Sequence, residues 1–388
     1  MNRPLPQPTD STPARPISPK SPGPAGVPAE SADGLALIKP AVRSQAAYAL
    51  VSPQARRKLN QNECPYDLPA ELKREVLDEV ASLAWQRYPD FSPPGLLVRL
   101  AERYGWVPDG VLVGNGSNEL IQATLSVTLG PGDVVVAPTP TFSLYRLLTN
   151  VLGGRYVPVG LGPEFEYDVN RLIEAAVRER ARVVILNSPN NPTGSALPDG
   201  AVEQVLAQTD ALVVCDEAYQ DFGGPSAIPL LRRSSRLVVL RTFSKAFGMA
   251  GLRFGLALAH PDVARELAKG KLPYNVNVVT LAAAAIALRH AASLEERTRE
   301  IVATRDRFIQ GLREISGLKV FPSSANFVLI RLLAVPAPEA YQRLLMQHGI
   351  LVRDVSSAAE LGDCLRISIG TPEDMDAVLQ ALTTISGR

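Results

Sequence analysis

Seven short runs of apolar, mainly β-branched residues lie between residues 111 and 259, separated by stretches of helical character. Runs that are apolar at successive positions are typical of strands that helices cover on both faces. Seven such strands with intervening helices predict an α/β fold, with a large three-layer α/β/α domain around a mostly parallel seven-stranded sheet. The runs are VLVG (111–114), DVVVAP (133–138), RYVPV (155–159), ARVVILN (181–187), ALVVCDE (211–217), RLVVLRTFS (236–244) and FGLALA (254–259).

The remaining sequence predicts how the other domains are arranged. Ten of the 33 prolines lie in residues 1–40, mixed with Ser, Ala and Gly, so we expect this tail to be disordered. Residues 41–75 are expected to join a small domain and to reach a dimer partner, and residues 76–270 to form the large domain. Residues 271–388 are predicted to hold a long connecting helix, roughly 276–316, and a smaller α+β domain. The strands of that domain are expected in LKVFP (318–322), NFVLIRL (326–332), ILVRDV (350–355) and CLRISIG (364–370).

Charge and residue counts argue against several classes of partner. The formal net charge is +1 and no long basic run occurs, so neither nucleic acid nor an anionic membrane is an expected partner. No apolar stretch has the length of a bilayer span, and the N-terminal tail lacks the apolar region of a secretory signal. Three scattered cysteines and three histidines predict no disulfide framework and no metal site. We therefore expect a cytoplasmic protein.

The segment TFSKAFGMAGLRFG, residues 242–255, places a lysine directly after a predicted strand. The start of a helix disfavours a cation but suits a phosphate, and the hydroxyls of Thr242 and Ser244 and the guanidinium of Arg253 add phosphate-binding groups. Lysine is the side chain that forms Schiff bases with aldehydes. The pattern indicates that Lys245 holds pyridoxal phosphate covalently. The alternative is an ordinary surface lysine.

Two further motifs, one with acidic and one with amide side chains, also follow predicted strands. Ligands bind at these strand ends in open α/β sheets. In VVCDEAYQDF (213–222), Asp216 is expected to keep the cofactor's pyridine nitrogen protonated, and Tyr219 to hydrogen-bond the phenolic oxygen. In NSPNNPTG (187–194), Asn191 is expected to contact the same oxygen. A helix cap and a simple Pro/Asn/Gly turn are the structural alternatives.

Two further segments carry candidate cofactor contacts. GNGSNEL (114–120) leads from a strand into a helix, and its backbone N–H groups, with Ser117 and Asn118, are suited to cradle a phosphate. In PTPTFSLY (138–145), Phe142 is placed to stack on a planar ring, unless it serves only core packing.

Two arginines in the predicted small domain are candidates for substrate binding. Arg366 lies within an apolar strand, where a charge is costly without a counter-ion. Arg353 is similar, although Asp354 beside it allows a local ion pair as the alternative. Together they indicate recognition of an anionic substrate through carboxylate or phosphate.

Taken in order, these motifs resemble the fold-type I aminotransferases, a class I and II family that uses pyridoxal phosphate. The resemblance covers about residues 41–388. Within that group the chain is most similar to the histidinol-phosphate aminotransferase family, although Phe142 stands where the family often has Tyr and Cys64 where it often has Asn or Tyr. The narrower likeness is carried by KLNQNECPYDLP (58–69), RYPD (87–90), LVRD (351–354) and CLRISIG (364–370).

The resemblance implies a role for each site residue and a homodimer with shared active sites. Lys245, Asp216 and Tyr219 would act in catalysis. Tyr88 would reach the cofactor phosphate of the neighbouring subunit. Arg353 and Arg366 would hold the substrate's anionic groups, with Asn62 and Glu63 in the 60–66 loop at the mouth of the site. The remaining cofactor contacts implied are Asn191, Phe142, Ser117, Asn118, Thr242, Ser244 and Arg253.

The implied activity is transamination between L-histidinol phosphate and 2-oxoglutarate, giving imidazole acetol phosphate and L-glutamate. Three alternatives remain open at this point. An aromatic amino acid aminotransferase would share every cofactor residue, and a decarboxylase acting on threonine phosphate would need no amino acceptor. An aminotransferase-like sensor domain of a transcription factor would carry an N-terminal winged-helix module, which the proline-rich tail does not resemble.

Overall fold

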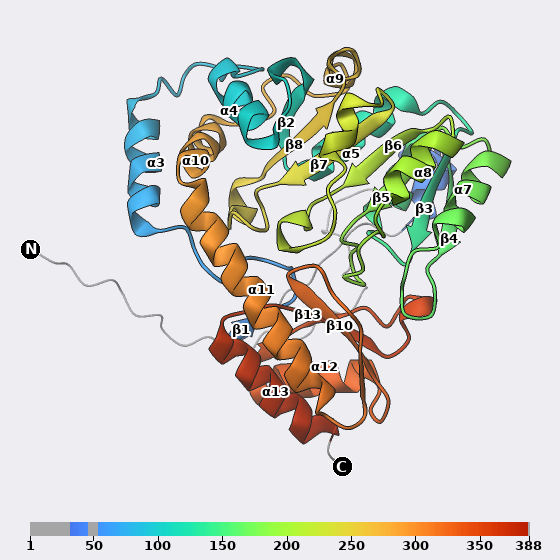
Figure 1. Ribbon diagram of the computed structural model, residues 1–388, viewed down its shortest axis with the longest axis vertical. Coiled ribbons are helices and arrows are strands. Elements are labelled where there is room, and N and C mark those ends of the chain that lie inside the picture. The colour runs from blue at the N-terminus through green and yellow to red at the C-terminus, as the bar shows by residue number, and fades with distance from the viewer. Residues whose placement is uncertain (1–31, 46–52, 387–388) are drawn as a thin grey trace, which may run out of the picture. The chain divides into compact units, whose positions relative to one another are not determined.

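The computed structural model describes residues 32–45 and 53–386 and divides into two compact units, residues 1–46 and 47–388 (Figure 1). In the first unit, two short helices are described, α1 (Ala32–Ala36) and α2 (Pro40–Arg43). Of the tail expected to be disordered, residues 32–36 form the short helix α1. Residues 1–31 of the predicted tail lie outside the described residues.

The second unit contains the predicted seven-stranded sheet. Its strand order is β2-β8-β7-β6-β5-β3-β4, and β8 runs antiparallel to both its neighbours while the other pairs are parallel. All seven predicted strands are confirmed, with ends displaced by at most two residues. They are β2 (Val111–Asn115), β3 (Val134–Thr139), β4 (Arg155–Gly160), β5 (Val183–Asn187), β6 (Leu212–Asp216), β7 (Leu237–Thr242) and β8 (Phe254–Ala259).

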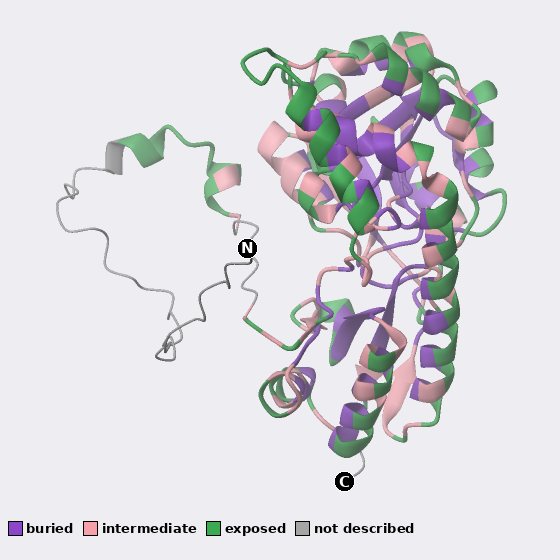
Figure 2. Cartoon of the chain, turned by 90° about the vertical axis from the view of Figure 1, so that its left-hand side faces the viewer, coloured by how far each residue is buried: buried purple, intermediate pink, exposed green. Residues whose placement is uncertain are grey.

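Helices cover both faces of this sheet, which completes the three layers predicted from the sequence. Successive strand residues face opposite sides, so Val135 packs with one set of helices and Val134 and Val136 pack with the other. The central strands β5, β6, β7 and β8 are buried along almost all of their length, whereas the edge strand β4 is largely exposed or half-buried (Figure 2). One face carries α5 (Ser117–Thr128), α6 (Leu144–Leu152) and α9 (Pro261–Ala268); the other carries α4 (Pro94–Tyr104), α7 (Val169–Arg178), α8 (Ala201–Gln208) and α10 (Val278–Arg289), with α3 (Ala70–Ser82) packed on α10.

A smaller α+β lobe follows. Its antiparallel sheet has the order β12-β13-β10-β9, and the parallel pair β1 and β11 lies apart from it. The predicted strand ILVRDV is split at Val352, because its first half pairs with β1 and its second half with β13. The lobe comprises β1 (Arg57–Lys58), β9 (Leu318–Val320), β10 (Phe327–Leu332), β11 (Ile350–Leu351), β12 (Arg353–Asp354), β13 (Cys364–Ser368), α11 (Ala291–Arg313), α12 (Ala337–His348) and α13 (Pro372–Ser386).

The single long helix expected over roughly 276–316 is two helices, α10 and α11, which meet at His290 with a bend of 81°. His290 departs from helical geometry, and the buried face of α10 packs on the large lobe while α11 packs on the small one. Among the described residues no single helix is long and apolar enough to cross a membrane, and only this bent pair meets that test by length and composition. Short 3-10 turns connect other elements: η2 (Pro108–Gly110), η3 (Gln220–Phe222), η4 (Ile228–Arg232), η5 (Ala250–Leu252) and η6 (Ala359–Leu361).

The segment after β1 runs between the two lobes. Leu59 donates its N–H to the Leu351 carbonyl at 2.7 Å and accepts the N–H of Ser368 at 3.0 Å. These bonds fix the segment to the small lobe. Residues Asn60, Gln61 and Asn62, which we call the strap, continue from that point and line a large cavity.

Candidate active site

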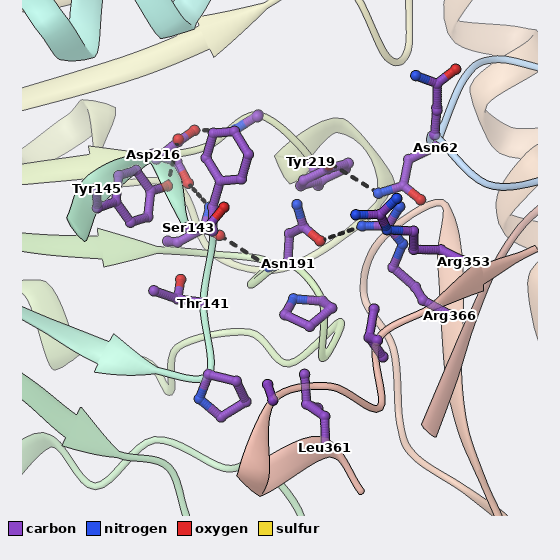
Figure 3. Close-up of a pocket in the computed structure, with 18 of the residues that line it drawn as sticks. Asn62, Thr141, Ser143, Tyr145, Asn191, Asp216, Tyr219, Arg353, Leu361 and Arg366 are labelled. Carbon is purple, nitrogen blue, oxygen red and sulfur yellow. Dashed lines mark hydrogen bonds between the residues drawn. The ribbon is translucent and has the colours of Figure 1, made fainter. Parts of the chain in front are cut away.

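A cavity of about 950 Å³ lies where the parallel strands of the large sheet end and the small lobe begins (Figure 3). Strands β2, β3, β5, β6 and β7 all have their carboxyl ends at this edge, since β8 alone runs the other way. The structure brings every residue predicted for the site to the lining of this cavity except Tyr88 and Glu63. The predicted residues in the lining are Asn62, Ser117, Asn118, Phe142, Asn191, Asp216, Tyr219, Thr242, Ser244, Lys245, Arg253, Arg353 and Arg366.

Lys245 supplies a nucleophile. It lies just beyond β7, and its Nζ donates to the carbonyl oxygen of Gln61 at 2.9 Å. Burial, together with the positive charge of Arg366, lowers the pKa of this amine to about 7, while Glu63 acts in the opposite direction. A large fraction of the amine is therefore neutral near pH 7, which is the form that attacks a carbonyl carbon.

The opposite wall carries a buried carboxylate. Asp216 ends β6 and is 3% exposed. The Tyr145 hydroxyl donates to its Oδ2 at 2.7 Å, and the Ala218 N–H donates to its Oδ1 at 3.1 Å. Burial raises the pKa of this carboxyl, and the two hydrogen bonds lower it in part. A cationic group beside Asp216 would be strongly favoured, because it would neutralise a charge that water cannot reach.

Tyr219 and Asn191 lie between Asp216 and the small lobe. The Tyr219 hydroxyl accepts a hydrogen bond from Asn62 Nδ2 at 3.0 Å. The Asn191 side-chain carbonyl accepts one from Arg366 at 2.5 Å, and its backbone N–H donates to Asn187 Oδ1. Both side chains thus present polar atoms to the cavity from fixed positions.

An anion cradle forms at the start of α5. Gly116 precedes the helix with φ 80°, so the first N–H groups of α5 point outward beside Arg253, which itself donates to Ser244 Oγ at 3.3 Å. A Cβ on Gly116 would lie 2.5 Å from the Arg253 guanidinium, and one on Gly255 would lie 2.3 Å from the Ser117 nitrogen. Only glycine leaves room for this close approach. Thr242 braces the cradle by accepting the Ser244 N–H at 3.2 Å.

Phe142 follows β3 and lies on the cavity wall. Its ring contacts Tyr145 edge-on, with ring centroids 5.6 Å apart. Because Tyr145 also donates to Asp216, Phe142 lies on the side of the cavity that contains this carboxylate.

Two arginines enter the cavity from the small lobe. Arg353 on β12 stands directly opposite Arg366 on β13, so both side chains lie on one face of the sheet. Arg366 donates to the Asn60 carbonyl at 2.7 Å as well as to Asn191. Among the described residues no ion pair joins Arg353 to Asp354, because that carboxylate accepts from Ser356 instead.

Glu63 and Tyr88 lie elsewhere. Glu63 pairs with Lys58 and lines a second cavity of about 410 Å³, on the far side of the strap. The expected contact of Glu63 with the main cavity is therefore absent from the described structure. Tyr88 is 80% exposed and stacks on Tyr274, with ring centroids 4.5 Å apart.

Several groups that line the cavity were not predicted from the sequence. Tyr145 was overlooked because an aromatic residue in an amphipathic helix looks like a core residue, and its hydroxyl contact with Asp216 spans 71 residues. The strap acts through the backbone carbonyls of Asn60 and Gln61, which carry no residue-type signal. The segment from Val355 to Leu361 closes one side of the cavity without any chemical motif.

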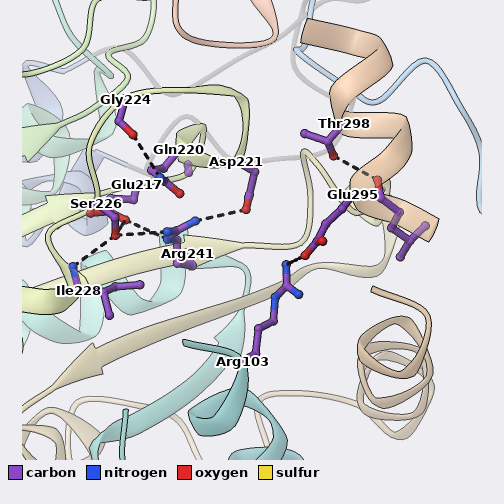
Figure 4. A network of polar contacts seen from close by, with 12 residues as sticks. Arg103, Glu217, Gln220, Asp221, Gly224, Ser226, Ile228, Arg241, Glu295 and Thr298 are labelled. Carbon is purple, nitrogen blue, oxygen red and sulfur yellow. Dashed lines mark hydrogen bonds and ion pairs between the residues drawn. The ribbon is translucent and has the colours of Figure 1, made fainter. Parts of the chain in front are cut away.

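A separate network of polar contacts joins residues at the ends of β6 and β7, next to the site (Figure 4). Glu217 is 2% exposed and pairs with Arg241 at 3.0 Å, and Arg241 also reaches Asp221 at 3.3 Å. Because Glu217 follows Asp216 and Arg241 precedes Thr242, this pair ties the ends of β6 and β7 together. It therefore fixes the spacing between the buried carboxylate and the lysine segment.

The lowered pKa of Lys245 predicts how the stability of the ligand-free protein depends on pH. The unfolded chain keeps this amine protonated up to about 10.4, whereas the folded chain releases its proton near 7. Between those values the unfolded state binds more protons, so the free energy of unfolding should rise with pH. We expect Lys245→Met to stabilise the ligand-free protein by about 2–4 kcal/mol at pH 6 and much less at pH 10. Urea unfolding at the two pH values measures this, and an equal effect at both would contradict it.

The fold and this cavity define an α/β protein with a buried lysine of lowered pKa, a buried carboxylate and the start of a helix beside an arginine at one sheet edge. The chain belongs to the aminotransferase class I and II family, whose model matches residues 57–382. This confirms the family resemblance found in the sequence, and the protein is an aminotransferase.

Individual relatives agree with this assignment. The chain is 38% identical over 357 residues to the histidinol-phosphate aminotransferase of Chlorobium phaeovibrioides, covering 92% of this chain and 98% of that one. It is 40% identical over 351 residues to the protein of the same name from Thermococcus gammatolerans, covering 90% and 98%. The crystal structure of histidinol-phosphate aminotransferase from Sinorhizobium meliloti, in complex with pyridoxal-5'-phosphate, matches with a TM-score of 0.82 and 27% identity, covering 91% and 98%.

Proposed function

We propose that this protein catalyses pyridoxal-phosphate-dependent transamination between L-histidinol phosphate and 2-oxoglutarate, as a step of histidine biosynthesis. The observation that carries the proposal is a second anion site, Arg353 and Arg366, in the same cavity as the cradle at Arg253. Lys245 lies in that cavity as well. The relatives named histidinol-phosphate aminotransferase support the same substrate.

The residues present fit pyridoxal phosphate. The cradle at the start of α5, with Ser244 and Arg253, would hold its phosphate, and its close packing around Gly116 leaves room for backbone donors to approach. Asp216 would face the pyridine nitrogen, Phe142 would cover the ring, and Tyr219 and Asn191 would hold its phenolic oxygen. When bound, the cofactor supplies a carbonyl that condenses with amines and a cationic ring that withdraws electrons from the carbon losing its proton.

The side chains of Lys245 and Asp216 have separate roles in the proposed reaction. Lys245 would anchor the cofactor through Nζ, and the same amine, once free, would take the proton from the substrate's Cα and later release it. Its lowered pKa suits this exchange near neutral pH. Asp216 would keep the ring nitrogen protonated, because its buried carboxylate would gain a partner only while that nitrogen is charged.

The two arginines explain how one site serves two substrates. Glutamate carries a carboxylate on the carbon that bears its amine, whereas histidinol phosphate carries a phosphate ester in the corresponding place. Arg353 and Arg366 project from neighbouring strands and can form paired hydrogen bonds to either anion. A phenylalanine substrate presents only the carboxylate to this pair.

Half-reactions of the purified protein test the substrate. L-Histidinol phosphate, glutamate, phenylalanine and threonine phosphate are added separately to the pyridoxal phosphate form, and the visible absorbance of the cofactor is followed. Saturating conversion to the pyridoxamine form with histidinol phosphate and glutamate, and little with phenylalanine, supports the proposal. A preference for phenylalanine would make the protein an aromatic aminotransferase, and release of CO₂ from threonine phosphate would make it a decarboxylase.

The substitution Arg353→Gln tests whether Arg353 binds the substrate. Loss of a hydrogen bond to a charged group should raise the half-saturating concentration of histidinol phosphate about 10- to 100-fold. Arg343→Gln is the matched control, because Arg343 lies on α12 in an ion pair with Glu339 and does not line the cavity. Equal effects of the two substitutions would contradict the assignment of Arg353 to the substrate.

We also propose a homodimer, in which Tyr88 would reach the cofactor phosphate in the neighbouring subunit. Large apolar side chains are exposed around it, at Leu83, Trp85, Leu272 and Tyr274. Exposed apolar groups of this kind mark surfaces that bind another chain. Sedimentation of the purified protein distinguishes a dimer from a monomer, and a monomer at micromolar concentration would oppose the proposal.

We propose a cytoplasmic location because the cysteines form no disulfide in the described structure. Cys64, Cys215 and Cys364 are all free thiols in the described structure. Free thiols are typical of reducing compartments.

A further inference from the structure

Tyr145 on α6 is a buried tyrosine whose hydroxyl meets a carboxylate. Its side chain is 0% exposed, and its ring packs in the apolar layer between the sheet and the helices α5 and α6, with Phe142 edge-on beside it. Close packing on all sides leaves a ring of this size a single orientation. The position of the Tyr145 hydroxyl oxygen is therefore set by the core and not by the cavity.

The hydroxyl donates to Oδ2 of Asp216 at 2.7 Å, and Figure 3 shows the two side chains joined by this bond. The Ala218 N–H donates to the other oxygen, Oδ1, at 3.1 Å. Ala218 lies two residues from Asp216, whereas Tyr145 comes from a different element, 71 residues away. Each carboxylate oxygen can accept a second donor, and Asp216 lines the main cavity, so a bound molecule can supply one.

The surroundings of Asp216 make the Tyr145 bond important. Burial raises the pKa of Asp216, and the bonds from Tyr145 and Ala218 act against this rise. The hydroxyls and the thiol nearby have pKa values raised by burial, so they carry no charge near neutral pH, and Glu217 is compensated by Arg241. The titratable groups around Asp216, from its own strand, the neighbouring elements and the opposite wall, are Tyr145, Tyr167, Cys215, Glu217, Tyr219 and Lys245.

We propose that Tyr145 is a positioning residue, which keeps the carboxylate of Asp216 ionised and fixed in orientation before a ligand binds. The inference rests on the proposed function, in which the partner of that carboxylate is the protonated pyridine nitrogen of the cofactor. Tyr145 acts in this role through Asp216. Only an ionised Asp216 pairs with a cation, so any fraction of it that is protonated weakens the binding of the cofactor.

The consequence is a change in how cofactor affinity depends on pH. Without the Tyr145 hydroxyl, Asp216 should hold its proton more tightly, and one hydrogen bond of this kind corresponds to about 0.5–1 in pKa. The acid side of the affinity profile should therefore move up by about 0.5–1 pH unit, which lowers affinity there by about 3- to 10-fold. At pH 8 the affinity should change little, because Asp216 is then ionised with or without the bond.

Tyr145→Phe removes the hydroxyl and keeps the ring, and Tyr167→Phe is the matched control. Tyr167 is also buried, at 8% exposed, but its hydroxyl donates to the backbone carbonyl of Asn187 instead of a carboxylate. The cofactor-free proteins are titrated with pyridoxamine phosphate, an amine that forms no Schiff base with Lys245, from pH 4.5 to 8.5. We expect the shift in Tyr145→Phe, no shift in Tyr167→Phe, and no further shift when Tyr145→Phe is added to Asp216→Asn.

The profiles separate the possible failures. An affinity that is unchanged, or that falls equally at every pH, overturns the inference, because Tyr145 would then serve packing alone. A shift that persists in the Asp216→Asn background overturns it too, since the tyrosine would act without the carboxylate. If the unsubstituted protein binds no pyridoxamine phosphate at any pH, the proposed function fails, and the role of Tyr145 toward the ring nitrogen fails with it.

Urea unfolding of the cofactor-free proteins measures the contact without any ligand. In Tyr145→Phe the folded carboxyl of Asp216 should bind its proton more tightly than in the wild type, so the free energy of unfolding should fall more steeply as the pH rises. The urea midpoint of Tyr145→Phe should therefore lie further below that of the wild type at pH 8 than at pH 5. Equal differences at the two pH values would overturn the inference.

Discussion

Lys245→Ala is expected to lower kcat by about 10⁴-fold or more, because the substitution removes both the covalent anchor and the group that moves the proton. The fold should survive, since among the described residues the hydrogen bond of the Lys245 amine goes to a backbone carbonyl, that of Gln61, and to no other element of the core. Steady-state transamination with histidinol phosphate and 2-oxoglutarate measures the loss.

Lys271→Ala is the matched control for this substitution. Lys271 is also a buried lysine, 7% exposed, and burial lowers the pKa of its amine too. It does not line the cavity, and it lies over the Phe91 ring. Its loss should leave kcat within a few-fold of the wild type. A comparable loss in both variants would mean that a buried amine matters for folding rather than for chemistry at Lys245.

Asp216→Asn is expected to lower kcat by about 10²–10³-fold, because a neutral amide cannot hold the proton on the pyridine nitrogen. Asparagine has nearly the same shape; its oxygen can still accept from the Ala218 N–H, and its NH2 can donate to the Tyr145 oxygen in place of the bond that Tyr145 donates to Asp216. The free energy of unfolding should therefore change little, and the loss should appear in kcat.

The substitution Glu217→Gln is expected to lower stability rather than kcat. Glu217 is as deeply buried as Asp216 but pairs with Arg241, away from the cavity lining. Breaking a buried ion pair costs about 3–5 kcal/mol of stability. We expect a large fall in the urea midpoint and a small change in kcat. If Glu217→Gln lowers kcat as much as Asp216→Asn does, then the special role of Asp216 is contradicted.

Much of the fold was predictable because its signals are local. Runs such as ARVVILN and RLVVLRTFS are apolar at successive positions, and a buried parallel strand needs nothing more to be recognised. The two errors in the elements have a common cause. The break at His290 and the split of ILVRDV at Val352 depend on which distant segment each half packs against.

The site, like the fold, was predictable where it depends on local sequence and not where it depends on contacts between distant segments. Asp216, Asn191 and Lys245 each follow a strand, and strand ends of a parallel sheet meet at one edge, so their grouping followed from sequence order. The contacts of the strap were not predictable, because Asn62 reaches Ser368 across 306 residues and Tyr219 across 157. Asn62, expected at the mouth of the site, lines the cavity, and its bonds to Ser368 and Tyr219 carried no signal in the sequence.

The location of the cofactor's covalent bond tests the central claim most directly. The purified protein is loaded with pyridoxal phosphate, reduced with borohydride, digested, and analysed by mass spectrometry. We predict a single modified peptide, with the reduced adduct on Lys245. An adduct on another lysine, or no stable adduct in a protein that still transaminates, would contradict the account.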